Sequence, residues 1–279
     1  MHIPYASYAI FSRTPTPKTR EWQHRLKEHL SDRWPTIVEG SVNEAGFLIV
    51  LGGDGTFLDL LRSYPETRAH VLACNTGHEG FLCSVRDEGQ FVATLDAALT
   101  GTLVSMQVPV LQVICQSQGE RRVFRAVNDV LLERTMTWLA LKMEIVSDEA
   151  LVWFKTMQSS GVCTCSAIGS TSPMAVHLSA PRMDPSIRAL YVKGINERRA
   201  VPTGSIISAA TERLRITLMD VGCNTGIPAG LQQPPSVFVD GIYATSLMAG
   251  DTIEIAYASQ SVTLLRVPGD THWDRLRSC

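Results

Sequence analysis

Two hydrophobic periods divide the chain. Over the first hundred residues, continuous apolar runs such as Phe47–Leu51 alternate with segments in which apolar residues recur every four positions, as Trp22, Leu26 and Leu30 do. Continuous apolar runs are typical of strands buried on both faces, and the longer period is typical of amphipathic helices. Strands and helices in alternation predict an open parallel sheet covered by helices.

Local signals place the elements of this first region. Strands are predicted at residues 8–11 and 71–74 from their apolar runs. A helix is predicted to start at Thr16-Pro17, because threonine is a good N-cap and proline fits the first helical position. Two further helices are predicted from apolar residues at helical spacing, namely Phe57, Leu60, Leu61 and Tyr64, and then Phe91, Leu95 and Leu99.

Beyond about residue 101 the hydrophobic period changes to two. Leu141, Met143 and Ile145 alternate with charged residues, and Asp240-Gly241 supplies the turn chemistry of a hairpin. We therefore expect a two-domain chain: an α/β domain at residues 1–100 and a β-rich domain at residues 101–264, with the segment at about 265–279 packing back on the first domain.

Composition limits the partners. The 25 Lys and Arg residues nearly balance the 27 Asp and Glu residues, so no bulk charge attracts nucleic acid or an anionic membrane. No apolar run approaches the length of a membrane span, and the first residues lack the pattern of a secretory signal, which predicts a cytoplasmic protein. The 7 cysteines include no CxxC pair, so reduced structural thiols are favoured and no metal site is predicted from side chains alone.

The segment LGGDGTFL places Gly52, Gly53 and Gly55 around Asp54, between a predicted buried strand and a predicted helix. Glycines at such a junction let backbone N–H groups approach an anion, and phosphate is the natural guest. The spacing matches neither GxGxxG nor GxxxxGK[ST]. An aspartate among phosphate-binding amides repels the phosphate unless it accepts a proton or holds Mg²⁺, so the loop indicates phosphoryl transfer; a helix cap in a tight turn is the alternative.

This loop resembles the GGDGT loop shared by NAD kinases, diacylglycerol and sphingosine lipid kinases and, in a variant form, phosphofructokinases. Three later segments resemble NAD kinases in the same order. Residues 75–82, NTGHEGFL, are similar to the NxGxxGFL segment, and residues 126–130, AVNDV, are similar to the Asn-Glu or Asn-Asp motif. Residues 161–179 are similar to the glycine-rich segment, so the resemblance spans nearly the whole chain.

The resemblance implies an α/β N-terminal domain with a parallel sheet and an all-β C-terminal domain, with the active site in the crevice between them. ATP, or polyphosphate in some members, would phosphorylate the adenosine 2′-hydroxyl of NAD to give NADP, with Mg²⁺ on the phosphates. Asp54 would be the general base, and the phosphate cradle would comprise Gly52, Gly53, Gly55 and Thr56. The NAD-binding residues would be Asn75, Phe81, Asn128, Asp129, Ser160, Thr171 and Ser172. The family also implies a homodimer or homotetramer.

Two departures from the family pattern bear on activity. Ser160-Gly161 stands where most NAD kinases have Asp-Gly, and Ser172-Pro173 replaces Ala-Tyr. The first removes a charge-assisted partner for the dinucleotide, and the second removes a stacking surface. We interpret the chain as an active but divergent kinase. The alternatives are a lipid kinase with the same loop, which would need an apolar acyl pocket in the β domain, and a non-catalytic nucleotide-binding relative.

Overall fold

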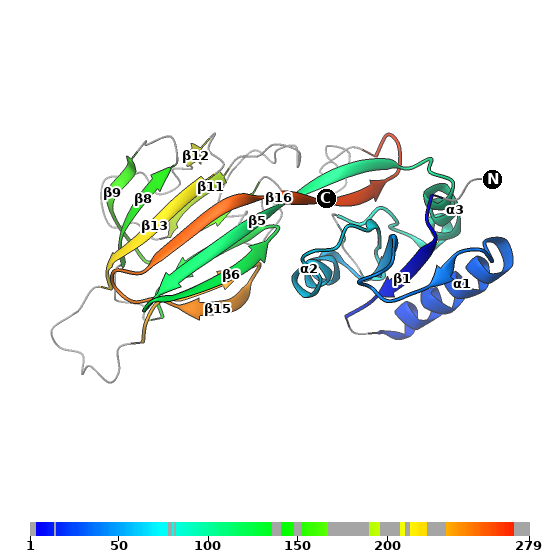
Figure 1. The fold of residues 1–279 in the computed structure, drawn as a ribbon, viewed down its shortest axis with the longest axis horizontal. Helices are drawn as coiled ribbons and strands as arrows, with labels where there is room; N and C mark the ends of the chain where they lie inside the picture. The colour runs from blue at the N-terminus through cyan, green and yellow to red at the C-terminus, as the bar shows by residue number, and fades with distance from the viewer. Residues whose placement is uncertain are drawn as a thin grey trace. The chain divides into compact units, whose positions relative to one another are not determined.

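The computed structural model describes residues 4–13, 15–77, 80, 82–135, 141–147, 152–166, 190–195, 207–209, 213–221 and 233–270. The chain divides into two compact units, which we call the first unit (Met1–Val108 with Ser261–Cys279) and the second unit (Pro109–Gln260). The chain passes from one unit to the other within β5 (Val104–Ser117) and returns within β16 (Thr252–Arg266), as Figure 1 traces.

The first unit is a parallel sheet with helices. Its elements before the crossing are β1 (Ser7–Phe11), α1 (Pro17–Arg33), β2 (Val38–Glu39), β3 (Phe47–Leu51), α2 (Asp54–Ser63), β4 (His70–Cys74) and α3 (Glu88–Leu99). The strands lie in the order β2-β1-β3-β4-β16, and all four pairings are parallel. The returning end of β16 therefore completes the sheet through Thr263 and Leu264, which pair with β4.

Local chemistry explains the first helix. The Thr16 side chain accepts a hydrogen bond from the Thr19 backbone N–H at 3.1 Å, and Pro17 occupies the first turn, as predicted. The buried face of α1 is the predicted stripe of Trp22, Leu26 and Leu30.

In the core of the first unit, α1 and α3 pack against one face of the sheet. Trp22 on α1 packs against Phe91 on α3, with 4.7 Å between ring centroids. Both rings belong to one buried cluster with Phe47 and Ile49 of β3, while the alternate residue Leu48 is also fully buried. Burial of both faces is what the continuous apolar run predicted.

The second unit consists of antiparallel strands in two layers. Its elements are β6 (Glu120–Ala126), β7 (Asp129–Glu133), β8 (Leu141–Ser147), β9 (Val152–Ser159), β10 (Gly161–Cys165), β11 (Leu190–Ile195), β12 (Ile207–Ala209), β13 (Arg213–Asp220), β14 (Ser236–Val239) and β15 (Ile242–Ser246). One sheet has the order β12-β11-β10-β7-β14-β15. In the other layer β16 pairs with β13, β13 with β8 and β8 with β9, while β5 pairs with β6.

Period-two alternation accounts for the core of the second unit. Leu141, Met143 and Ile145 are buried, whereas Lys142 and Glu144 between them are partly exposed. The predicted fold class, a parallel α/β region followed by antiparallel β structure, is confirmed.

Within one sheet, the neighbouring strands β10 and β7 approach so closely that glycine is required at one position. A Cβ atom added to Gly161 would lie 2.3 Å from the carbonyl oxygen of Leu132 on the neighbouring strand β7. A side chain at this position would force the strands apart, so glycine is needed for close approach rather than for an unusual backbone angle.

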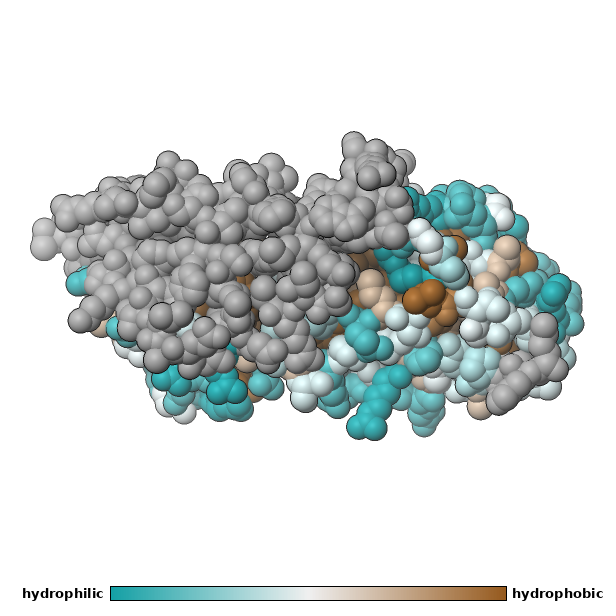
Figure 2. Space-filling model, turned by 90° about the horizontal axis from the view of Figure 1, so that it is seen from above, coloured by the Kyte–Doolittle hydropathy of each residue, from teal (hydrophilic) through white to brown (hydrophobic). Residues whose placement is uncertain are grey.

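The surface of the described residues is mixed in character. In the view of Figure 2 these residues are coloured mostly in hydrophilic shades, with small hydrophobic areas among them. Among the described residues, the exposed large apolar side chains are Val38, Val104, Val123, Met219, Ile242, Tyr243 and Met248. Within the described part of the chain, no helix has the length and hydropathy needed to cross a membrane.

Candidate active site

The glycine loop joins β3 to α2 and leaves the helix N-terminus open. Gly53 is the N-cap of α2, with extended backbone at φ −91° and ψ −167°, and it provides no side-chain cap. Asp54 is the first residue of the helix, so it is not the N-cap that the alternative interpretation of the loop required. The uncapped first turn presents backbone N–H groups and the positive end of the helix dipole, which favours an anion.

The glycines of the loop have different roles. A Cβ atom on Gly52 would lie 2.1 Å from Oγ1 and 2.5 Å from Cβ of Thr56, so the start of α2 would have to shift. A Cβ atom on Gly55 would have no atom within 4 Å. Gly52 is therefore needed for the packing of the loop, and the space beside Gly55 is open to a guest.

The Asp54 carboxylate is held by the segment that follows Asn75. Its Oδ1 atom accepts a hydrogen bond from the Leu82 N–H at 2.8 Å. The Cys83 thiol donates to the Gly52 carbonyl oxygen at 3.5 Å and lies 4.0 Å from Asp54 Oδ1. Two motifs that are separate in the sequence therefore meet at one carboxylate.

This segment is itself fixed against the sheet. The Ser84 N–H donates to the Ala73 carbonyl at 2.8 Å, and the Asn75 N–H donates to the Val85 carbonyl at 2.8 Å. Asn75 is 4% exposed, and its Oδ1 atom accepts from the Gly77 N–H at 3.0 Å. The Asn75 side chain thus shapes the turn after β4. Phe81, predicted to border the dinucleotide, lies outside the described residues.

In the second unit, Asn128 and Asp129 are positioned by an aspartate that sequence analysis assigned only to a turn. The Asp240 carboxylate accepts hydrogen bonds from the N–H groups of Val127 at 2.9 Å, Asn128 at 2.8 Å and Asp129 at 3.1 Å. Asp240 and Gly241 have positive φ angles of 47° and 74° in the hairpin between β14 and β15. The Asp-Gly turn was visible in the sequence, but nothing there indicated which amides the carboxylate would bind.

The Asn128 side chain carries an unused acceptor. Its Oδ1 atom is buried and has no hydrogen-bond partner among the described residues. Because buried polar atoms are normally satisfied, this oxygen is ready for a donor from a ligand or water. The backbone beside it is held by Ser166, whose N–H donates to the Asn128 carbonyl at 2.9 Å.

The other predicted dinucleotide contacts are less defined. Ser160 is 5% exposed, and its carbonyl accepts from the Arg134 N–H at 3.0 Å. Thr171 and Ser172 lie outside the described residues. The five described cysteines are buried and are not in disulfides. Burial, with a smaller effect of Asp129, raises the pKa of Cys165 to about 12. This thiol is neutral at physiological pH, as expected for a structural cysteine.

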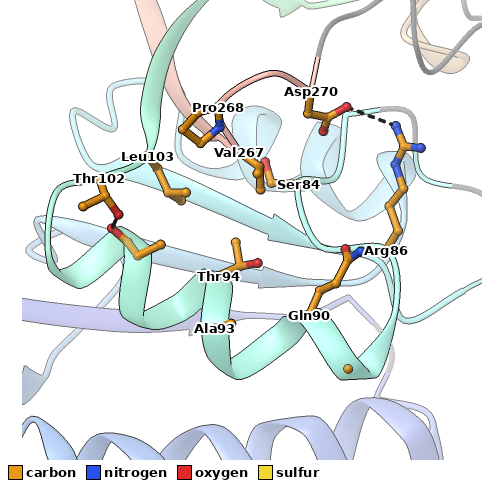
Figure 3. Close-up of a pocket in the computed structure, with 12 residues that line it drawn as sticks. Ser84, Arg86, Gln90, Ala93, Thr94, Thr102, Leu103, Val267, Pro268 and Asp270 are labelled. Carbon is orange, nitrogen blue, oxygen red and sulfur yellow. Dashed lines mark hydrogen bonds and ion pairs between the residues drawn. The ribbon is translucent and has the colours of Figure 1, made fainter.

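A separate cavity of about 680 Å³ lies in the first unit beside α3. Figure 3 shows it between α3 and the segments that follow β4 and β16, with Thr94 on the helix, Ser84 and Arg86 on one segment, and Val267 and Asp270 on the other. The glycine loop does not contribute to its lining among the described residues.

Comparison with known proteins finds similar sequences over most of the chain. Residues 12–103 match the family described as ATP-NAD kinase N-terminal domain. Curated relatives include an NAD kinase of Syntrophotalea carbinolica, 26% identical over 261 residues that cover 92% of this chain and 85% of that protein. An NAD kinase of Symbiobacterium thermophilum is 27% identical over 235 residues, which cover 84% of this chain and 78% of that protein.

Solved structures share the fold. A crystal structure of yeast NADH kinase complexed with NADH superposes with a TM-score of 0.81 at 19% identity, covering 98% of this chain and 86% of that one. An NAD kinase from Archaeoglobus fulgidus in complex with ATP gives a TM-score of 0.72 at 16% identity, covering 98% and 99%.

Fold and loop together define the class: a parallel α/β unit with a GGDGT loop at a helix N-terminus, joined to an antiparallel β unit. Within that class the later segments and the relatives agree on one family. The chain resembles NAD kinases over nearly its whole length, and residues 12–103 match the N-terminal domain of that family.

Proposed function

We propose that the chain is an NAD kinase, which transfers the terminal phosphoryl group of ATP to the adenosine 2′-hydroxyl of NAD and yields NADP and ADP. The observation that carries the proposal is the placement of Asp54: a single carboxylate, fixed by the Leu82 N–H at 2.8 Å, at the first position of a helix whose N-terminal amides lack a side-chain cap. Relatives that cover most of the chain carry the name NAD kinase.

In the proposed reaction Asp54 accepts the proton of the 2′-hydroxyl as that oxygen forms its bond to the γ-phosphorus of ATP. The bond between the γ-phosphorus and the oxygen bridging it to ADP breaks, and the electron pair leaves with ADP. The hydrogen bond from Leu82 restricts the carboxylate to one orientation, which favours a fixed approach of the acceptor hydroxyl.

The phosphates of ATP are assigned to the loop from Gly52 to Thr56. Backbone N–H groups at the start of α2 would donate to phosphate oxygens, and the open space beside Gly55 leaves room for them. Gly53 has extended backbone, which keeps the amide of Asp54 at the head of the helix.

Recognition of the dinucleotide is assigned to Asn75 in the first unit and to Asn128, Asp129 and Ser160 in the second, with Phe81, Thr171 and Ser172 as further contacts. Asn128 has the strongest structural support, because its buried Oδ1 atom lacks a partner among the described residues. An amino or hydroxyl group of the adenosine would satisfy that acceptor.

A magnesium ion is part of the proposal. No cluster of three or more His, Cys, Asp or Glu residues suited to a metal occurs in the described part of the chain. Mg²⁺ on nucleotides is usually bound by phosphates and water with one or two carboxylates, so a single Asp54 beside a phosphate loop fits this ion. When bound, the ion would neutralise charge on the phosphates during transfer.

The test is an incubation of purified protein with Mg-ATP and NAD, with NADP measured by an enzymatic cycling assay. We expect the wild type to form NADP in a reaction that depends on ATP. We expect the Asp54→Asn variant to form NADP only at a low residual rate. Parallel reactions with polyphosphate as donor and NADH as acceptor identify the substrate pair. Labelled ATP with diacylglycerol or sphingosine tests the lipid-kinase alternative, and nucleotide binding without any transfer would identify a non-catalytic relative.

Two further properties are proposed from the family resemblance. We expect a homodimer or homotetramer, and a monomer in light scattering at micromolar concentration would contradict this. We expect a cytoplasmic location, which cell fractionation would test.

A further inference from the structure

Three side-chain ties join the segment after β4 to the end of β16. The Arg266 Nη1 atom donates to the Leu82 carbonyl oxygen at 3.0 Å, and the Ser84 hydroxyl donates to the Leu265 carbonyl. At the far end, Arg86 and Asp270 form an ion pair at 3.5 Å, which Figure 3 shows beside the cavity. Residues about 180 positions apart in the sequence are thereby held together within the first unit.

The Arg266 contact differs from the other two because its partner is Leu82, the residue whose N–H binds the Asp54 carboxylate. Leu82 donates its N–H to Asp54 Oδ1 at 2.8 Å and accepts from Arg266 through its own carbonyl. The residues Arg266 and Leu82 are 6% and 3% exposed, so water does not readily replace these contacts. A hydrogen bond with an ionised donor is stronger and shorter than a neutral one, and burial strengthens it further.

We propose that Arg266 is a positioning residue for Asp54. Its guanidinium group fixes the backbone of Leu82, and this orients the Leu82 N–H that restrains the Asp54 carboxylate. In this scheme Arg266 acts on Asp54 through Leu82. The inference deepens the proposed function and rests on it for its kinetic consequence, whereas its structural consequence does not depend on turnover.

The chain provides matched variants. Arg266→Met keeps much of the side-chain volume and removes the donors, while Arg266→Lys keeps a charge and one donor toward the Leu82 carbonyl. Arg86→Met is the control, since it removes an arginine tie between the same two segments at a site where the arginine side chain is 39% exposed. Each variant is compared with the wild type for the hydrogen exchange of the Leu82 amide, for kcat, and for the KM values of NAD and ATP.

In Arg266→Met we expect the Leu82 amide to exchange about tenfold faster or more, and kcat to fall about 10-fold to 10²-fold, while both KM values stay within about threefold. In Arg266→Lys we expect partial recovery of both quantities. In Arg86→Met we expect exchange and kcat to remain within about twofold of the wild type.

Unchanged Leu82 exchange and unchanged kcat in Arg266→Met would overturn the proposal. So would equal effects of Arg86→Met, because Arg266 would then only join two segments. If Arg266→Met fails to fold, the Arg266→Lys variant decides. The proposal would be contradicted if the Leu82 amide of Arg266→Lys exchanged as in the wild type while kcat fell only as much as in a globally destabilised control. If the wild type forms no NADP, the proposed function fails, while the Leu82 exchange still decides the positioning.

Discussion

The two units assemble their parts of the candidate site in different ways. In the first unit, strand, glycine loop, carboxylate and helix are contiguous between Phe47 and Ser63. In the second unit, Asn128 and Asp129 are held by the carboxylate of Asp240, which is 112 and 111 residues away. A site built from contiguous residues is set by local backbone geometry, whereas the second depends on the pairing of β14 with β7, which lie far apart in the sequence.

This difference suggests a division of roles. The uncapped helix N-terminus and its aspartate suit phosphate and proton transfer, and the buried acceptor of Asn128 suits recognition of a base or ribose edge. Variants of the loop from Gly52 to Thr56 should then change turnover or ATP binding, and variants that alter Asn128 or its backbone should change NAD binding.

The largest effect is expected for Asp54→Asn. The amide keeps the shape of the carboxylate but cannot accept the proton of the 2′-hydroxyl, and removal of a general base typically lowers kcat by about 10² to 10⁴. The measurement is initial rate of NADP formation at saturating NAD and Mg-ATP. Turnover retained near the wild-type value would remove Asp54 from the chemistry and make Asp129 the next carboxylate to test.

A smaller effect, on NAD rather than on turnover, is expected for Asp240→Ala. Three N–H groups lose a charged acceptor, the Asn128-Asp129 backbone loses its restraint, and KM for NAD should rise about 10-fold to 10²-fold. The control is Asp251→Ala, since the Asp251 carboxylate also accepts from a backbone N–H, that of Met248 at 2.6 Å. The control should lower stability and leave KM for NAD unchanged; equal KM changes would mean that Asp240 has only a general folding role.

The next largest effect is expected when a side chain is added to the glycine loop. Gly55→Val places atoms in the open space assigned to phosphate, so KM for ATP should rise about tenfold while KM for NAD changes by less than about threefold. Gly52→Ala is the comparison, because its methyl group would collide with Thr56 and should lower the thermal midpoint. Equal loss of ATP and NAD affinity in Gly55→Val would show that the loop only maintains the fold.

The smallest effect concerns the pH dependence of stability in the first unit. Burial raises the pKa of Asp96, but hydrogen bonds from His29 Nε2 at 2.7 Å and Trp34 Nε1 at 2.8 Å, together with the charges of His29 and Arg33, outweigh burial and lower the pKa below its ordinary value. Because the folded pKa is depressed, Asp96 stabilises the fold at neutral pH, and that contribution is lost as pH falls through the folded pKa. Asp96→Asn should lower the thermal midpoint by about 2–4 °C at pH 7 and by less at acidic pH; a midpoint loss that does not depend on pH would contradict the assignment.

Most of the first unit could be predicted from the sequence. The Thr16-Pro17 helix start, the buried run of β3 and the helix after the glycines depend on signals within a few residues. The hairpin at Asp240-Gly241 was predicted for the same reason. The role of the Asp240 carboxylate was not, because it depends on which strand lies beside the turn.

Arg266 illustrates the same limit more strongly. In the sequence, a single arginine after an apolar run is typical of a strand that ends in solvent. Only the parallel pairing of β16 with β4 brings Arg266 to Leu82. Asn128 was identified as a candidate through its motif, but the absence of a partner for its Oδ1 atom among the described residues is a property of the folded unit. Long-range pairing, rather than local propensity, therefore determined what sequence analysis missed.

The separation of roles is tested most directly by the dissociation constant of NAD, measured by calorimetry for the wild type, Asn128→Ala and Asp54→Asn. We expect Asn128→Ala to weaken NAD binding about tenfold or more, with no loss of thermal stability because the oxygen it removes has no partner among the described residues. We expect Asp54→Asn to bind NAD within about threefold of the wild type, or more tightly, because a negative charge near the phosphates is removed. Weakened NAD binding in Asp54→Asn together with wild-type binding in Asn128→Ala would contradict the account, since it would place dinucleotide recognition at the loop of the first unit.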